Sequence, residues 1–342
     1  MSQTLDDVAR IAGVSRSTVS RVINDHPSVS EKARCAVEEA IAKCGYRPHA
    51  VARSLATNTT NIVGIVVPES VTKLFTDPYF PLMLRGATEA CNQNGYHLIL
   101  SLFTGTVASG VMHDRIARSG YIEGVVLANA SLDEELIPSL FDEGIPFVNI
   151  GRHPNDLVNY VDVDNTGGAR MATEHLIRLG HSRIATIAGP SDMTPSQDRL
   201  NGFLDVMSAH RLPVSEGLVA EGDFTEAGGR AAMMQLLAES PTAVFAASDT
   251  MAICAIKALR AADLRVPEDV AIVGFDDIPS SLTIDPELTT VRQPIEQIGR
   301  MAVETLFSVI RSSRQTGYPS SAQRLVLPTE LVIRKSCGHG MA

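Results

Sequence analysis

A cluster of hydrogen-bonding side chains near the N-terminus is suited to contact with base edges. Ser15, Arg16 and Ser17 are consecutive, and Arg21 follows about one helical turn later. A guanidinium can pair bidentately with guanine, and a serine hydroxyl can donate to or accept from several bases. Further hydroxyl and amide groups are suited to phosphates, which position a protein without specifying a sequence: Thr4, Thr18, Ser20 and Asn24. The chemistry predicted for this cluster is recognition of double-stranded DNA.

The apolar spacing around the cluster predicts the helices that must position it. A first helix is expected to begin after Thr4, and Gly13 supplies a tight turn before the second helix. Ala9 is small enough for a close helix crossing, and Val19 is placed to pack the second helix onto the first. A third helix is predicted within residues 30–45. This is the outline of a helix-turn-helix, whose second helix enters the major groove. A short polar helical bundle without a DNA-binding role is the alternative.

The charge is distributed unevenly along the chain. Residues 1–60 contain eight Arg and Lys against six Asp and Glu, whereas the whole chain has a net charge of −10. An acidic body with a mildly basic head does not suit coating of nucleic acid by the whole surface. DNA binding is therefore expected of the head alone.

The remaining residues alternate short apolar runs with helical patterns. Expected strands include Ile62–Pro68, Tyr96–Leu102 and Ala243–Ala246, and expected helices include Gly168–Leu179 and Thr250–Ala261. Alternation of this kind predicts parallel sheets that are covered on both faces. The stretch is too long for one such unit, so two doubly wound lobes with a ligand cleft between them are expected.

Catalytic and cofactor motifs are missing from the sequence. No GxSxG, HExxH, GxxxxGK[ST] or strand-following GxGxxG pattern occurs. His175 and His181 are six residues apart and are interpreted as capping or surface residues, while Cys337 and His339 are assigned to a frayed tail. The five cysteines form no CxxC pair, which disfavours a disulfide framework or a zinc site. We therefore expect no catalytic residues, no metal and no cofactor.

The head resembles that of the lactose-repressor (LacI) family of bacterial transcription regulators. The resemblance rests on TLDDVARIAGVSRSTVSRVINDHPSVSEKAR, continuing into GYRPHAVARSLAT. It implies a hinge helix at about 49–56 that folds on operator DNA and enters the minor groove with that of a second subunit. Leu55 would then be the apolar wedge at the central base step, with Ala52 packed beside it.

The same family resemblance extends over the body, through DPYFPLMLRG, VDNTGGARMATEHLIRLGHSRIATIAGP, ASDTMAICAIKAL and GFDD. It implies an all-α helix-turn-helix headpiece (residues 1–60) plus an α/β periplasmic-binding-protein-like core (61–342). The expected N-lobe is about 61–161 plus 292–321, and the expected C-lobe is about 162–291 plus 322–342. Crossings between lobes are predicted near 161–164, 289–293 and 319–324, the last in a polar stretch rich in turn formers.

The cleft residues follow from the resemblance and from local chemistry. Asp276 ends an apolar strand, where doubly wound sheets bind ligands, and its alternative role is a cap for the next turn. Arg199 is a candidate for a bidentate contact, and its alternative is a solvated helix position. Asp249 is expected to cap the helix from Thr250. Further expected effector contacts are Tyr79, Phe80, Arg152, Phe224 and Ser248.

Together these features predict a sequence-specific repressor, not an enzyme. The expected partners are a pseudo-palindromic operator, a second copy of the chain, and a small effector, for which the family resemblance favours a sugar or sugar derivative. The segment MSQTLDD lacks the pattern of a secretory signal, so a cytoplasmic, nucleoid-associated protein without a membrane partner is expected. A purine-type corepressor and a ligand-independent DNA binder remain alternatives, whereas a free periplasmic binding protein would lack the head.

Overall fold

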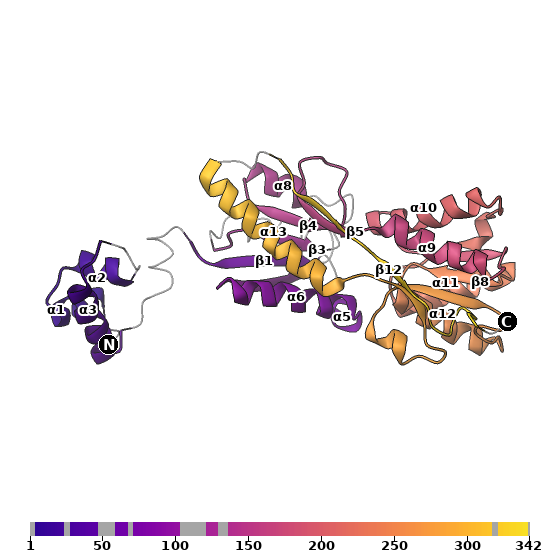
Figure 1. Cartoon of the computed structure of the whole chain (residues 1–342), viewed down its shortest axis with the longest axis horizontal. Helices are drawn as coiled ribbons and strands as arrows, with labels where there is room; N and C mark the ends of the chain where they lie inside the picture. Colours follow the sequence, from indigo (N-terminus) through magenta and orange to yellow (C-terminus); the bar gives the residue numbers. More distant parts are fainter. Residues whose placement is uncertain are drawn as a thin grey trace. The chain divides into compact units, whose positions relative to one another are not determined.

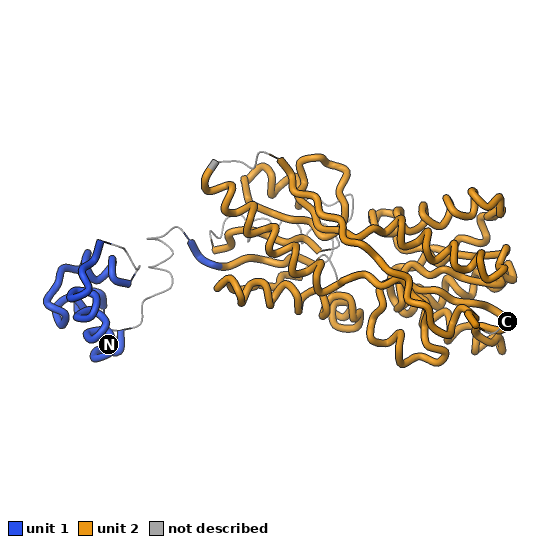
Figure 2. Tube along the Cα trace, viewed as in Figure 1, with its two compact units in different colours: residues 1–61 blue, residues 62–342 orange. Residues whose placement is uncertain are grey.

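The computed structural model divides the chain into two compact units, residues 1–61 and residues 62–342 (Figure 2). The structure describes residues 4–23, 28–46, 59–67, 71–102, 121–128, 136–316 and 321–340. The predicted hinge helix, with Ala52 and Leu55, lies outside these residues, as does Asn24. No helix in the described ranges is both long enough and apolar enough to cross a membrane.

The described part of the first unit folds as three helices around a small core. They are α1 (Leu5–Ala12), α2 (Arg16–Ile23) and α3 (Glu31–Cys44). The hydroxyl of Thr4 accepts from the backbone N–H of Asp7 and so caps α1, which Gly13 ends in a left-handed conformation with φ of 67°. Val8 and Val19, from α1 and α2, are fully buried in the shared core. The predicted helix-turn-helix and third helix are confirmed.

The N-lobe of the second unit is a parallel sheet of six described strands in the order β11-β5-β4-β3-β1-β2. Its strands are β1 (Ile62–Val67), β2 (His97–Leu102), β3 (Val125–Ala128), β4 (Phe147–Ile150), β5 (Tyr160–Val163) and β11 (Arg324–Leu327). Its described helices are α5 (Val71–Thr76), α6 (Tyr79–Gln93), α8 (Leu136–Asp142) and α13 (Ile295–Thr316). Val63 and Ile65 of β1 pack under α6 and α13, whereas Val66 joins the cluster of α8 on the opposite face. Burial on both faces explains the nearly unbroken apolar strands.

The C-lobe is a second six-stranded sheet in the order β12-β10-β9-β8-β6-β7, parallel except for the β10–β12 pair. Its strands are β6 (Ile184–Ala188), β7 (Val219–Glu221), β8 (Ala243–Ala246), β9 (Ala271–Asp276), β10 (Thr289–Arg292) and β12 (Glu330–Val332). Its helices are α9 (Asn165–Arg178), α10 (Thr194–Ala209), α11 (Glu226–Leu236) and α12 (Asp249–Ala261), with short 3-10 turns η1 (Glu216–Leu218), η2 (Leu237–Glu239) and η3 (Pro279–Leu282). The prediction of two doubly wound α/β lobes is confirmed.

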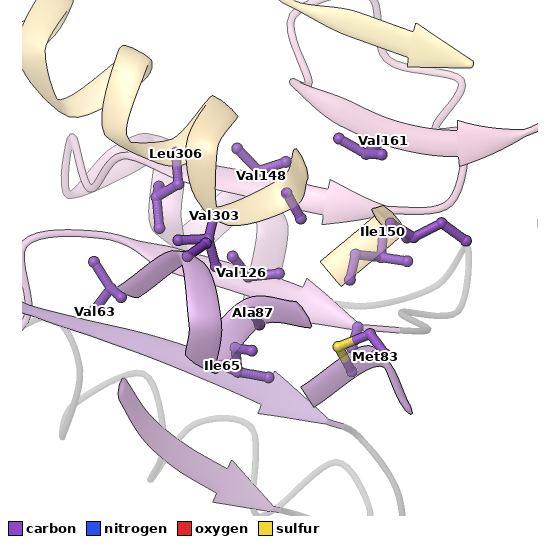
Figure 3. Packing of buried hydrophobic residues seen from close by; sticks show 14 of the residues in the cluster. Val63, Ile65, Met83, Ala87, Val126, Val148, Ile150, Val161, Val303 and Leu306 are labelled. Atoms are coloured by element: carbon purple, nitrogen blue, oxygen red, sulfur yellow. The ribbon is translucent and has the colours of Figure 1, made fainter. Parts of the chain in front are cut away.

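The long helix α13 lies across the N-lobe beside α6 (Figure 1). Its side chains Val303 and Leu306 face the strands, as do Met83 and Ala87 of α6 (Figure 3). The two helix backbones approach so closely that a Cβ added at Gly86 would overlap the carbonyl oxygen of Glu296 in α13. The helix pair therefore depends on the absence of a side chain at this crossing.

The predicted position of the third lobe crossing is wrong. The first crossing follows β5 and the second follows β10, within or next to the expected segments. Residues 324–327, however, pair in parallel with β5 as strand β11, so the chain enters the C-lobe only between Leu327 and Glu330. Of the polar stretch 311–322, residues 311–316 form the end of α13, before β11 begins at Arg324. The described residues of the N-lobe thus lie within 62–163 and 295–327, and those of the C-lobe lie within 164–294 and 328–340.

The expectation of a frayed tail is also wrong. Cys337 is buried, and its Sγ lies 3.3 Å from Nε2 of His175 and accepts from Oγ1 of Thr289 at 3.2 Å. His175 is likewise buried rather than a surface residue. The tail joins the C-lobe, since the backbone carbonyl of Ser336 accepts a hydrogen bond from the backbone N–H of Ile272 in β9 at 2.8 Å. In the described ranges, no group of three or more His, Cys, Asp or Glu side chains is arranged to hold a metal.

Candidate functional site

A cavity of about 630 Å³ lies between the two lobes of the second unit. Strand ends supply much of its lining, as expected for parallel sheets whose carboxyl edges face a cleft. Five of the seven predicted effector residues line it: Tyr79, Arg199, Phe224, Ser248 and Asp276.

A buried Arg–Asp pair lies on the C-lobe side of this cavity. Nη1 of Arg199 lies 3.7 Å from Oδ1 of Asp276, and both side chains are less than a tenth exposed. Arg199 also donates through Nε to Oδ1 of Asn165 at 2.8 Å and through Nη1 to the carbonyl of Ala247 at 2.6 Å. Asp276 accepts from Nε2 of Gln293 at 2.5 Å, and its burial raises the pKa well above the ordinary carboxyl value despite Arg199. The pair is therefore held rigidly, with most of the guanidinium fork already engaged.

Phe224 reaches the cavity from a strained backbone. Its φ is 61°, in the left-handed region that bulky residues rarely adopt, and Asp276 has a φ of 121°. A Cβ added at Gly189 would overlap the ring of Phe224, so glycine lets this ring lie against the end of β6. Strain at two cavity residues indicates that the surrounding fold holds them for a function other than packing.

Ser248 both lines the cavity and takes the capping role that was expected of Asp249. The Ser248 hydroxyl accepts from the N–H of Met251 at 3.3 Å and caps α12, so the cap predicted for Asp249 is wrong. Asp249 is fully buried and accepts from the hydroxyls of Ser281 and Thr290, both at 2.5 Å. Burial raises the pKa of Asp249 to about 7. Asp249 therefore fastens η3 and β10 behind the cavity.

Of the three effector contacts predicted on the N-lobe side of the cavity, only one belongs to its lining. Tyr79 lines the cavity, and burial raises the pKa of its phenol, which keeps the hydroxyl available as a donor. Phe80 is fully buried in the N-lobe core, edge-to-face with Tyr79, and is not part of the lining. Arg152 also lies outside the lining, and its guanidinium donates to both carboxylate oxygens of Asp198 on α10, at 3.2 and 2.7 Å. This bidentate ion pair joins the two lobes.

Five polar lining residues did not emerge from the sequence: Lys73, Asp77, Asp162, Asn165 and Gln293. Three of them lie within two residues of the carboxyl ends of strands β5 and β10, which is close to the signal that identifies Asp276. Applied to every strand, that rule finds Asp162, Asn165 and Gln293. Lys73 lies on the short helix α5, and Asp77 directly follows this helix.

In the first unit, the base-contact candidates are exposed at the start of α2. Ser15, Arg16, Ser17 and Arg21 are exposed, while Thr18 and Ser20 are half-buried. The hydroxyl of Ser15 lies 2.8 Å from that of Ser17 and 2.9 Å from that of Thr18. The hydroxyl of Thr4 donates to Asp7 at 2.8 Å within the cap of α1. The first turn of α2 thus presents a cluster of hydroxyls with one guanidinium.

Comparison with known proteins covers both units. Residues 4–49 match the family model described as bacterial regulatory proteins, lacI family, and residues 173–337 match the periplasmic binding protein-like domain. The HTH-type transcriptional regulator CelR of Thermobifida fusca is 42% identical over 341 residues, covering 97% of this chain and 98% of that protein. The ribose operon repressor of Escherichia coli K12 is 35% identical over 345 residues, covering 97% and 99%.

Solved structures match the whole chain in the same way. A complex of the transcriptional regulator CelR with cellobiose has a TM-score of 0.77 at 40% identity and covers 98% of this chain and 99% of that chain. The lac repressor dimer bound to operator and the anti-inducer ONPF has a TM-score of 0.84 at 28% identity, with the same coverage. These relatives are regulators of transcription rather than enzymes. The chain belongs to the lacI family of bacterial regulatory proteins.

Proposed function

We propose that this protein is a repressor that binds a pseudo-palindromic operator as a homodimer and senses a neutral sugar in the cleft between its lobes. The observation that carries the proposal is the buried Arg199–Asp276 pair beside Phe224, in a chain of the lacI family. A dimer is part of the proposal because two symmetric recognition helices are needed for a palindrome. A cytoplasmic location follows from operator binding in a bacterium.

The charges around the cavity favour a neutral effector. Three carboxylates line it, from Asp77, Asp162 and Asp276, against two cations, Lys73 and Arg199. Since Nε and Nη1 of Arg199 already donate to protein oxygens, its fork is not open for a bidentate phosphate contact. Carboxylates accept well from sugar hydroxyls but repel phosphate, so a sugar is favoured over a sugar phosphate.

An aromatic face beside polar groups also suits a sugar. The ring of Phe224 can lie against the apolar face of a pyranose, while Tyr79 and Asp276 offer a donor and an acceptor to its hydroxyls. Because the CelR relative was solved with cellobiose, β-linked disaccharides are the first compounds to test. Tyr79 and Phe224 could also enclose a planar base, which keeps a purine as the second candidate.

A ligand panel distinguishes these candidates. We expect cellobiose or a related neutral sugar to raise the unfolding midpoint of the purified protein, because a ligand that binds only the folded state adds roughly 2.7 kcal/mol at a hundredfold excess over Kd. Sugar phosphates should have no effect. Stabilisation by purines alone would replace the sugar hypothesis, and operator affinity that is unchanged by every stabilising ligand would favour a ligand-independent binder.

The lobe contacts suggest how ligand occupancy reaches the DNA. Arg152 and Asp198 pair across the cleft, and Gln293 lies where the chain crosses into α13. A ligand that contacts both lobes changes their closure, and thereby the distance between the hinge segments of the two subunits. Coupling must be reciprocal, so the operator changes ligand affinity by the same factor. Leu55 and Ala52 remain the predicted minor-groove residues of that hinge.

Arg16 is expected to contact a base rather than phosphate. In operator selection, Arg16→Ala should relax the preference at one symmetric pair of positions by about 1–3 kcal/mol, because a bidentate pairing with guanine is lost. The affinity of Arg16→Ala for operators that carry another base at that position should fall less than its affinity for the preferred operator. An equal loss on all sequences would instead assign Arg16 to a phosphate contact.

A further inference from the structure

An exposed carboxylate lies beside the guanidinium of the recognition helix. Oδ2 of Asp6, in the first turn of α1, is 3.7 Å from Nη1 of Arg16, and both side chains are more than two-thirds exposed. The neighbouring Asp7 is engaged differently, since it accepts from Thr4 and from Arg10 at 2.7 Å. The cap of α1 therefore uses Asp7 and not Asp6, and the partner of Asp6 is Arg16, the side chain expected to contact a base.

An ion pair this exposed adds little to the stability of the fold. Its geometric effect is larger, because a guanidinium has five donors in a rigid planar fork. When Nη1 faces Asp6, the opposite edge of the fork can still donate to O6 and N7 of a guanine. The carboxylate also lies in a head that must approach phosphates, which repel it and so weaken binding to DNA of any sequence.

We propose that Asp6 is a positioning residue for DNA recognition, which aims Arg16 at a guanine and disfavours its use as a general phosphate contact. This inference rests on the proposed base contact of Arg16. Asp6 then has opposite effects on two measurable properties of DNA binding. Asp6 lowers affinity for non-operator DNA through its charge, and it raises discrimination between operators through the orientation of Arg16.

The test compares four full-length proteins: wild type, Asp6→Asn, Arg16→Ala and the double variant. Each is titrated with operator, with operators changed at the selected guanine, and with non-operator DNA. Glu38→Gln is the matched control, because Glu38 is an exposed acid on α3 of the same head. We expect Asp6→Asn to tighten non-operator binding and to reduce discrimination at the guanine by about two- to fivefold. The double variant should discriminate no worse than Arg16→Ala, and Glu38→Gln should leave discrimination unchanged.

Two results would overturn the inference, and they differ. If Arg16→Ala relaxes the guanine preference but Asp6→Asn does not, or if the two losses add, then Asp6 does not act through Arg16 and the base contact stands. If Arg16→Ala itself leaves the preference unchanged, the base contact fails and the role of Asp6 fails with it. Circular dichroism and unfolding midpoints that match wild type exclude a folding defect as the cause.

Discussion

Asp276→Asn is expected to weaken effector binding by about 1.5–3 kcal/mol, or roughly 10- to 150-fold, while operator binding without effector persists. The estimate is that of a hydrogen bond to a charged acceptor in a buried site. Asparagine keeps the shape of the side chain but replaces one oxygen by an NH₂ group. Arg199 and Gln293 both face Oδ1, so the amide oxygen can keep these two contacts while the NH₂ group takes the place of Oδ2, and the substitution loses the acceptor that is left for an effector hydroxyl.

The measurement is isothermal titration of the stabilising sugar, together with operator binding with and without it. Asp205→Asn is the control, since Asp205 lies on the same lobe in an exposed ion pair with Arg170. Asp205→Asn should keep wild-type affinity for the sugar. Wild-type affinity in Asp276→Asn as well would place the effector away from this carboxylate.

Gly86→Ala is expected to destabilise the second unit by about 3 kcal/mol, although alanine is normally the better helix residue. A methyl group at Gly86 would overlap the carbonyl oxygen of Glu296, so α6 and α13 must separate. For a unit of this size the unfolding midpoint should fall by roughly 5 °C.

Thr88→Ala provides the matched control on the same helix. Thr88 is exposed, so its substitution should change stability by no more than about 0.5 kcal/mol. Differential scanning calorimetry measures the unfolding midpoints of both variants against that of wild type. A midpoint for Gly86→Ala at or above that of wild type would show that the two helices can shift apart without loss of packing.

The three helices of the head were predictable because their determinants are local. The cap at Thr4 and the left-handed turn at Gly13 act within a few residues, and their geometry follows from residue type. The alternation of strands and helices likewise predicted both lobes. The third crossing was misplaced because an extended chain that passes from one sheet to the other carries no turn signal, whereas the polar stretch before it does.

The cleft was predictable only in part, because several of its features depend on distant partners. Asp276 could be recognised at a strand end, yet the partner of Arg152 is Asp198, 46 residues away, and nothing near either residue indicates the pairing. Tyr79 and Phe80 are adjacent on one helix, so the rotation of that helix decides which side chain meets the cavity. Sequence patterns do not specify that rotation.

The placement of α13 has a genetic consequence. This helix is encoded after almost all of the C-lobe, yet Ile298, Val303 and Leu306 belong to the N-lobe core. A nonsense mutation near codon 294 would therefore leave most of the C-lobe intact and expose the apolar face of the lobe encoded first. Such alleles should yield a product that is cleared by proteases, rather than a constitutively active repressor. Partial gene products of this architecture are thus expected to be null.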